Sequence, residues 1–388
     1  MRVVYDDPRT FLLGCASYDL ILVGTPDPSS GQANRFYSRE FFQSCARRMK
    51  PQGILAFRLH AAENFWTPLQ LLQMSSIYQA LHSVFPATIF LPGATTVITA
   101  SLNDLPLGPE IPSARLRERE IRSRLVTPAY LNYLYTNDRF ATLRNNLENA
   151  EAPANTDLRP VCYRLSAMIW LAKFFPSLNT AISDNFFSSG GKDHVLPFFL
   201  LFILTMTCFS LCRLIAPLRR LVLMAGIGFV GMVLETVLIL HYQVKSGVLY
   251  QDIGLLLTSF MVGLVLGPMI VFHRQRSNPA WGFGLMIGFF TLVALIDIHI
   301  IYMPFPGLAP AMVLLALIGL CVSACFAFIS LFAAPNPSAM VSPLYAADLF
   351  GGCLGALISG LFLIPFFGLD ITAAIMLVIS ASLLVLVG

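Results

Sequence analysis

The sequence predicts a partial α/β sheet of the doubly wound, Rossmann-like kind, followed by an all-α polytopic transmembrane bundle of about seven helices. Only 12% of the 388 residues are charged, whereas about 25% is typical of soluble proteins. Most of these charges lie before residue 190. From about residue 195 onward, apolar runs of roughly 20 residues follow one another, the length that a helix needs to cross a bilayer.

These patterns divide the chain into three regions. We expect the sheet domain at 1–105, a helical and loop connector at 106–193, and the transmembrane domain at 194–388. The boundaries follow a Pro/Gly-rich linker at 106–112 and the sequence SSGGKDH at 188–194, which we interpret as the hinge into the bilayer.

The first region alternates strands and helices. YDLILVG, at 18–24, is an unbroken apolar run of the kind that is buried on both faces of a parallel sheet. A parallel core finished by an antiparallel pair around Pro92-Gly93 indicates a nucleotide-binding sheet. The other expected elements are strands at RVVY (2–5), GILAFRL (53–59) and on both sides of Pro92, and helices at SREFFQSCARRMK (38–50) and about 65–84.

The connector is expected to be mostly helical. Residues 113–150 are polar and rich in arginine, which is typical of a solvated helix face. The sequence RLSAMIWLAKFF, at 164–175, predicts a short amphipathic helix for the membrane surface. The net charge of +4 is too small to indicate a nucleic-acid partner.

Seven membrane helices are predicted, and three acids within them are candidate functional residues. Glu235, Asp348 and Asp297 are costly in a bilayer, so they are expected to face a bundle interior or a water cavity. Two roles are open for them: hydrogen bonding between helices, or moving a cation or proton. The predicted helices are 195–212, 221–243, 250–272, 281–302, 309–332, 342–366 and 371–387.

The cysteines and histidines indicate no metal site. There is no CxxC pair, and the six histidines are scattered without ligand spacing. GIGFVG, at 226–231, fits a nucleotide-binding glycine pattern, but it lies within an apolar run. There, and in the glycines of GLVLG (263–267) and GGCLG (351–355), we expect close helix packing.

A loop with a single carboxylate follows the apolar strand at 18–24. By spacing alone, Asp27 is open to two interpretations: an Asp-Pro turn that caps the next segment, or a functional acid. Tyr37 begins the following helix and either lines a substrate pocket or packs in the core.

Three sequences, YDLILVGTPDP, NRFYSREFF and MKPQGILAFRL, resemble the polyamine aminopropyltransferase (spermidine synthase) family, in particular its membrane-fused bacterial branch. The resemblance implies a class I methyltransferase-like sheet, of which 1–105 would be the C-terminal half. It also implies that Asp27 is the general base on the attacking amine. The family's first loop acid is replaced here by Gly24, which weakens the case for amine binding.

The resemblance also covers VVYDDPRTFL, NTDLRP (155–160) and several membrane segments. It implies that Asp6, or less well Asp7, accepts a hydrogen bond from the adenine of the co-substrate, decarboxylated S-adenosylmethionine. No tightly bound cofactor is expected.

The resemblance leaves one side of the site unaccounted for. In such a sheet, a glycine-rich turn and a ribose-binding acid should come before Asp6, and only five residues do. We therefore expect the N-terminal donor-binding half to be absent, the chain to be inactive by itself, and a second chain or a preceding segment to complete the sheet.

Two alternatives to an enzyme stay open: a membrane transporter or binding protein for a small cation such as a polyamine, and a non-catalytic membrane scaffold. In each case the lipid bilayer is the main partner. The expected location is the bacterial inner (plasma) membrane. The positive-inside rule places the loops with Arg213, Arg219 and Arg220 and with Arg274 and Arg276 on the cytoplasmic side, and seven helices would then put the sheet domain on the other side. Two alternatives stay open, one membrane helix fewer or a preceding membrane region that sets the orientation, and the sheet domain is expected in the cytoplasm.

Overall fold

The structure is a computed structural model, and it divides into two compact units, Met1–Gly190 and Gly191–Gly388. The residues described are 3–14, 16–61, 66–93, 95–150, 152–174, 203–204, 206–207, 210–211, 214–247, 250–274, 279–302, 307–331 and 337–386.

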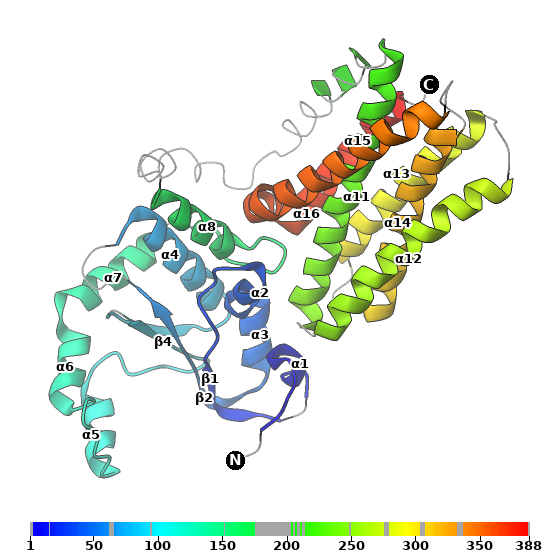
Figure 1. The fold of residues 1–388 in the computed structure, drawn as a ribbon. Coiled ribbons are helices and arrows are strands. Elements are labelled where there is room, and N and C mark those ends of the chain that lie inside the picture. Colours follow the sequence, from blue (N-terminus) through cyan, green and yellow to red (C-terminus); the bar gives the residue numbers. More distant parts are fainter. Residues whose placement is uncertain are drawn as a thin grey trace. The chain divides into compact units, whose positions relative to one another are not determined.

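A mixed four-stranded sheet organises the first unit, which we call the α/β unit (Figure 1). Its order is β1-β2-β4-β3, with β1 parallel to β2 and the other two neighbouring pairs antiparallel. The strands are β1 (Tyr18–Val23), β2 (Met49–His60), β3 (Ala87–Leu91) and β4 (Thr95–Ser101). The strand predicted at 2–5 is wrong for the described residues 3–5, which lie outside the sheet.

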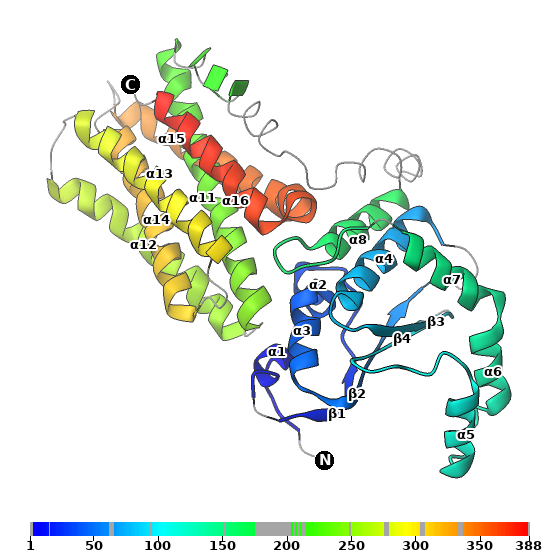
Figure 2. The same ribbon diagram turned by 180° about the vertical axis from the view of Figure 1, so that it is seen from behind.

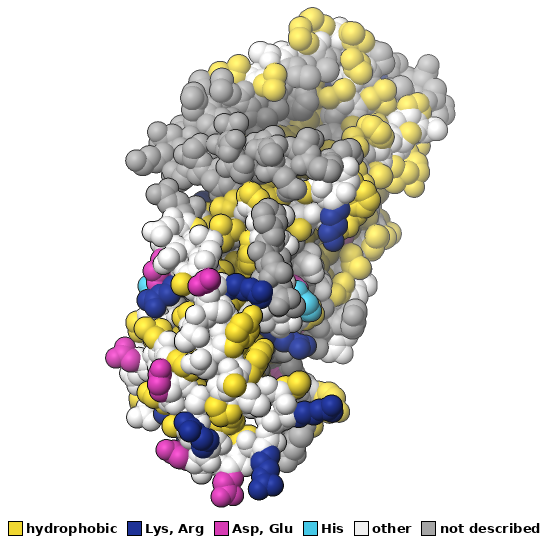
Figure 3. Space-filling view, turned by 90° about the vertical axis from the view of Figure 1, so that its left-hand side faces the viewer, with side chains coloured by type: hydrophobic (Ala, Val, Ile, Leu, Met, Phe, Trp, Pro, Cys, Tyr) yellow, Lys and Arg dark blue, Asp and Glu magenta, His cyan; other side chains and the backbone are white. Residues whose placement is uncertain are grey.

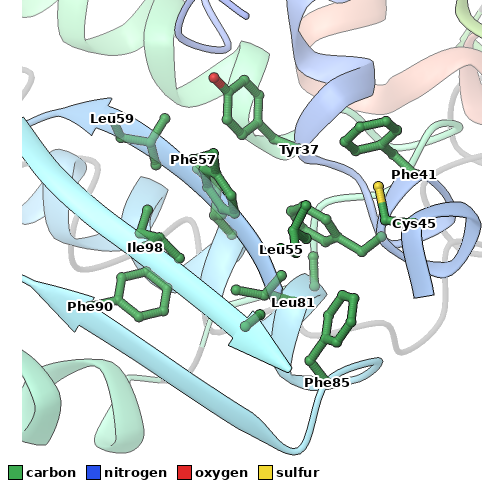
Figure 4. Packing of buried hydrophobic residues seen from close by; sticks show 14 of the residues in the cluster. Tyr37, Phe41, Cys45, Leu55, Phe57, Leu59, Leu81, Phe85, Phe90 and Ile98 are labelled. Carbon is green, nitrogen blue, oxygen red and sulfur yellow. The ribbon is translucent and has the colours of Figure 1, made fainter. Parts of the chain in front are cut away.

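One face of the sheet is covered by helices α3 (Arg39–Arg47) and α4 (Pro68–His82). The helix predicted at 38–50 ends earlier because Met49 already pairs with Tyr18 in the sheet. The ring of Phe57, on β2, lies 5.7 Å from that of Tyr37 and 5.8 Å from that of Phe42 (Figure 4). These aromatic side chains form the centre of the core.

The other face of the sheet is partly exposed, and several of its exposed side chains are apolar. Leu20 and Leu22 on β1 are 52% and 71% exposed, and Val97 on β4 is 42% exposed. The prediction that the strand at 18–24 is buried on both faces is therefore wrong for these leucines. The physical reason is that β1 is the edge strand of the described sheet, so no described strand on its outer side shields these side chains.

The connector helices match the predicted region in outline. They are α5 (Glu110–Glu118), α6 (Pro128–Thr136), α7 (Asp138–Asn149) and α8 (Val161–Ala172). Helix α8 packs beside α4, as both ribbon views show (Figures 1 and 2). Shorter helical segments are α1 (Pro8–Phe11), which precedes β1, and α2 (Gly31–Asn34) and η1 (Arg35–Tyr37), which lie between β1 and α3.

The described part of the second unit is helical, and five of its stretches are long and apolar enough to cross a membrane. The final stretch, Val341–Leu386, contains both predicted helices 342–366 and 371–387; the predicted helix 195–212 falls largely outside the described residues. The helices are α11 (Ala216–Ser246), α12 (Tyr250–Arg274), α13 (Pro279–Tyr302), α14 (Leu308–Leu331), α15 (Pro337–Ile358) and α16 (Ile364–Leu383), with η2 (Ser359–Leu363) and η3 (Leu384–Leu386).

Glycines bring these helices into close contact, which confirms the predicted packing role. A Cβ added at Gly263 of α12 would collide with the backbone of Ala316 on α14. Likewise, Gly351 of α15 lies against the backbone of Ala225 on α11. Figure 3 shows the difference in surface: charged side chains of both signs on the α/β unit, and chiefly hydrophobic ones on the described helices of the second unit.

Candidate functional site

Asp27 lies where the carboxyl ends of two neighbouring parallel strands meet. Val23, the last residue of β1, pairs with Phe57, and β2 runs three residues further to His60. The Asp27 carboxylate oxygen Oδ2 lies 2.8 Å from the His60 ring nitrogen Nδ1, and the His60 backbone N–H donates to Oδ1 at 3.3 Å. The two side chains are 39% and 75% exposed, so this acid–imidazole pair is open to solvent.

The loop that carries Asp27 is held on both sides through its carbonyl groups. The buried Tyr37 hydroxyl lies 3.0 Å from the carbonyl oxygen of Pro26, to which it donates. On the other side, the Ser166 hydroxyl of α8 donates to the carbonyl of Pro28 at 2.8 Å. Gln73 of α4 in turn donates to the Ser166 hydroxyl at 2.6 Å. The backbone is therefore fixed while the carboxylate remains accessible.

Tyr37 itself is 1% exposed. Burial raises the pKa of its hydroxyl, against a smaller opposite effect of the hydrogen bond with Thr25. The hydroxyl thus stays protonated and able to donate to the loop. The direct contact of Tyr37 with substrate stays a prediction.

The two candidate adenine acids differ in surroundings. Asp7 caps α1 by accepting from the backbone N–H of Arg9 at 3.0 Å, and it pairs with the buried guanidinium of Arg35. Burial lowers the pKa of Arg35, and the Asp7 carboxylate opposes that shift. Asp6 is exposed and accepts from the Asp7 backbone N–H at 2.8 Å. The adenine role of either acid stays a prediction.

A buried ion pair joins the start of the chain to the connector. Arg9 donates through both terminal nitrogens to both carboxylate oxygens of Asp157, each at 2.9 Å. The Ser38 hydroxyl donates to the same carboxylate at 2.6 Å, and the Asp157 backbone N–H donates to Glu40 at 3.0 Å. Asp157 belongs to the NTDLRP sequence, and its side chain is 1% exposed.

The neighbouring Asn155 extends this junction to the loop. Its side-chain amide donates to the carbonyl of Tyr37 at 2.9 Å, and its side-chain oxygen accepts from the backbone N–H of Cys162, the second residue of α8, at 3.2 Å. This part of the connector therefore helps to position Tyr37, which holds the Asp27 loop.

The predicted membrane acids lie on three different helices. Glu235 of α11 is 5% exposed, and its Oε2 has no hydrogen-bond partner among the described residues. The Asp348 carboxylate of α15 lies against Gly228, where a side chain would collide with it. On α13, neither Asp297 Oδ1 nor His299 Nε2 has a hydrogen-bond partner in the part of the chain that the structure describes.

Sequence reasoning missed several of these relations. The His299 ring lies 6.1 Å from that of His241, and Asp297 is within electrostatic range of Asp370 on α16. Sequence reasoning considered the histidines only for ligand spacing, and it missed the contact of His60 with Asp27. The signal that could have found this contact is the position of His60 at the end of a strand parallel to the one before Asp27.

The described ranges contain no group of three or more histidine, cysteine or acidic side chains that could hold a metal ion. Cys45 and Cys162 are free thiols with no exposed surface. Burial raises the pKa of each to about 12, so both stay protonated near neutral pH.

Comparison with known proteins gives a partial similarity. The chain is 30% identical over 120 residues to a polyamine aminopropyltransferase of Mycobacterium tuberculosis (strain ATCC 25618 / H37Rv), an alignment that covers 29% of this chain and 23% of the relative. The polyamine aminopropyltransferase of Oceanobacillus iheyensis is 37% identical over 54 residues, 13% of this chain and 10% of the relative. The chain thus spans about a quarter or less of these relatives. No protein-family model matches it.

Proposed function

We propose that this chain forms the amine-acceptor side of a membrane-bound aminopropyltransferase, with Asp27 as general base. The observation that carries the proposal is the exposed Asp27 carboxylate, held on a fixed loop at the carboxyl edge of β1 and β2. Ligands bind at this edge in open α/β sheets. The partial similarity to polyamine aminopropyltransferases supports the choice of reaction.

In the proposed reaction, the amine nitrogen attacks the propyl carbon next to the sulfonium of decarboxylated S-adenosylmethionine. The N–C bond forms, the C–S bond breaks, and the sulfur leaves as a neutral thioether with the bonding electron pair. Asp27 takes the proton that the amine nitrogen loses. His60, 2.8 Å away and largely exposed, is placed to receive that proton and pass it to water.

The proposal requires further strands beside β1 that bind the aminopropyl donor. Two observations support this requirement: β1 is an edge strand, and Leu20 and Leu22 are exposed on it. An apolar strand edge is a ready site for pairing with a further strand. We infer that strands of a Rossmann-like sheet, from further residues of the natural protein or from a second chain, complete the site here.

The test compares the 388-residue chain with the natural protein isolated from its own membranes, each with putrescine and the donor. We expect product only from a protein in which the sheet is completed. In that protein Asp27→Asn should lower the rate by about 100-fold or more. Asp19→Asn, which removes another exposed acid, is the matched control and should leave the rate unchanged.

Two results would contradict the proposal. Robust aminopropyl transfer by the 388-residue chain would show that no further strands are needed to bind the donor. An unchanged rate in Asp27→Asn would remove the base role.

We also propose the bacterial inner membrane as the location, with the α/β unit on the cytoplasmic side. The five apolar stretches support insertion. Arg219 and Arg220 near the start of α11 and Arg274 at the end of α12 support a cytoplasmic position for these helix ends, because cytoplasmic ends of membrane helices are rich in cations. The α/β unit shares that side on the further proposal that residues 195–212 do not cross the membrane. Protease protection of the α/β unit in sealed inverted vesicles would contradict it.

A second candidate function is transport of a small cation. The observation that favours it is Glu235, buried with an oxygen that has no hydrogen-bond partner in the described chain. The double variant Glu235→Gln with Asp348→Asn should then abolish putrescine uptake into vesicles. Thr258→Val, which removes a hydroxyl bonded only within its own helix, is the control. Unchanged uptake in the double variant would exclude this function.

The third function, a scaffold that binds another chain through glycine faces, has less support. Gly263, Gly267, Gly351 and Gly355 contact other helices of this same chain. Finding only monomers after crosslinking in native membranes would count against it.

A further inference from the structure

Helix α8 has two apolar faces. The inner face packs on the α/β unit through Val161, Leu165, Met168 and Ala172, all buried. Positions 163, 167, 170 and 174, spaced four, three and four residues apart, share the opposite face, and they are tyrosine, alanine, tryptophan and phenylalanine.

The end of this outer face is exposed and aromatic. Trp170 is 59% exposed and Phe174 is 63% exposed, with ring centroids 4.9 Å apart. Lys173, also exposed, lies between them in sequence. The outer face of a surface helix in water is normally polar. Tryptophan with a neighbouring lysine is instead typical of the boundary between water and lipid, where the ring and the lysine stem are apolar and the charge reaches the headgroups.

We propose that the outer face of α8 lies on the surface of the bilayer, with Trp170 and Phe174 among the lipid headgroups and Lys173 at their phosphates. This inference rests on the proposed membrane insertion of α11–α16. Two observations favour the bilayer as the partner of this helix face. The same chain carries five stretches able to enter a bilayer, and the exposed lysine complements anionic lipid.

The contact has a consequence for the proposed active site. Ser166 of the same helix donates to the carbonyl of Pro28, the residue after Asp27. A helix fixed at the bilayer therefore also fixes the loop that carries the proposed base.

The three tryptophans of the chain allow a direct test, because one lies in each relevant region: Trp66 against the sheet core, Trp170 on α8 and Trp281 in α13. Three variants each keep one tryptophan and carry phenylalanine at the other two positions. The full chain is reconstituted in phosphatidylcholine–phosphatidylglycerol vesicles, and quenching by lipids brominated near the headgroup is measured. We expect several-fold stronger quenching of Trp170 and Trp281 than of Trp66.

The outcomes distinguish the proposed position of α8 on the bilayer surface from the proposed membrane insertion of α11–α16. Quenching of Trp281 with Trp170 no more quenched than Trp66 would overturn the α8 inference and leave membrane insertion intact. Quenching of none of the three would overturn both.

A second measurement avoids the tryptophan substitutions. p-Benzoylphenylalanine replaces Phe174 in the otherwise natural chain, and the same label at Leu125, which is 78% exposed, is the control. Irradiation in the vesicles should give a phospholipid adduct at 174 and little at 125. An adduct between two protein chains at 174, without lipid, would overturn the inference.

Discussion

Two buried carboxylates, Asp157 in the α/β unit and Glu235 in the helical unit, differ in their hydrogen bonding. In the α/β unit, both oxygens of Asp157 bond to the Arg9 guanidinium, and the Ser38 hydroxyl adds a further hydrogen bond. In the helical unit, Oε2 of Glu235 has no hydrogen-bond partner within the described ranges. Asp27 represents a third arrangement, a carboxylate that is exposed on a fixed backbone.

This difference distinguishes structural from functional acids. When both oxygens of a buried carboxylate are hydrogen-bonded, these bonds offset the cost of its desolvation. The role of such a carboxylate is structural. A buried carboxylate with an unbonded oxygen costs stability, and in a membrane such a group usually serves a function. An exposed carboxylate costs little and stays available for chemistry.

The largest expected effect is on Asp157. Asp157→Asn removes the charge that compensates the buried Arg9, so the free energy of unfolding should fall by about 3–5 kcal/mol. Denaturant unfolding of the full chain in detergent, followed through the α/β unit, measures this loss.

The matched control is Asp19→Asn. Asp19 pairs with Lys50 at 2.8 Å, but their side chains are 81% and 50% exposed. An exposed pair contributes less than about 1 kcal/mol. A loss at Asp157 no larger than at Asp19 would contradict the structural role of the buried pair.

Glu235 should respond in the opposite direction. Glu235→Leu removes a buried polar group with an unbonded oxygen, so the free energy of unfolding should rise, by about 1–3 kcal/mol. Thermal unfolding of the full chain in detergent measures the change. A loss of stability similar to that of Asp157→Asn would mean that Glu235, too, is part of the fold.

The helix contacts should show a smaller effect. A methyl group added by Gly263→Ala meets the α14 backbone, and this overpacking should cost about 1–3 kcal/mol. At Gly288 an added methyl group has no atom within 4 Å, so Gly288→Ala should cost nothing. Equal effects in thermal unfolding would contradict the close crossing of α12 and α14.

Near neutral pH the smallest effect is that of two buried thiols, which lower stability only at alkaline pH. The pKa values of Cys45 and Cys162 lie at about 12 in the folded chain, above the ordinary value of 9.0. Above pH 9 the unfolded chain loses protons that the folded chain keeps, so stability falls as pH rises from 9 toward 12. Iodoacetamide at pH 8 should label both residues only after unfolding; labelling in the folded protein would contradict their burial.

The parts that sequence reasoning predicted well depend on local pattern. The helical spacing of Phe41, Phe42 and Cys45 predicted α3, and long apolar runs predicted α11 to α14. Glycine spacing predicted the close helix contacts. The loop acid Asp27 was singled out through the family resemblance, and its role stays a prediction.

The remaining parts depend on contacts between distant residues. Arg9 and Asp157 are 148 positions apart, and no periodic pattern links them. His60 approaches Asp27 only because β1 and β2 are neighbours in the sheet. The exposure of Leu20 and Leu22 could not be read from an apolar run, because burial on a second face depends on which other segments pack there.

The proposed role of Asp27 is the central claim, and one paired measurement on the natural protein from its own membranes tests it most directly. The Asp27→Asn variant is measured both for aminopropyl transfer and for unfolding. Because the carboxylate is exposed and its loop is held by backbone carbonyls, unfolding should be nearly unchanged. The rate should fall by about 100-fold or more. A variant that transfers the aminopropyl group at the natural rate, or a natural protein that forms no product, would contradict the claim.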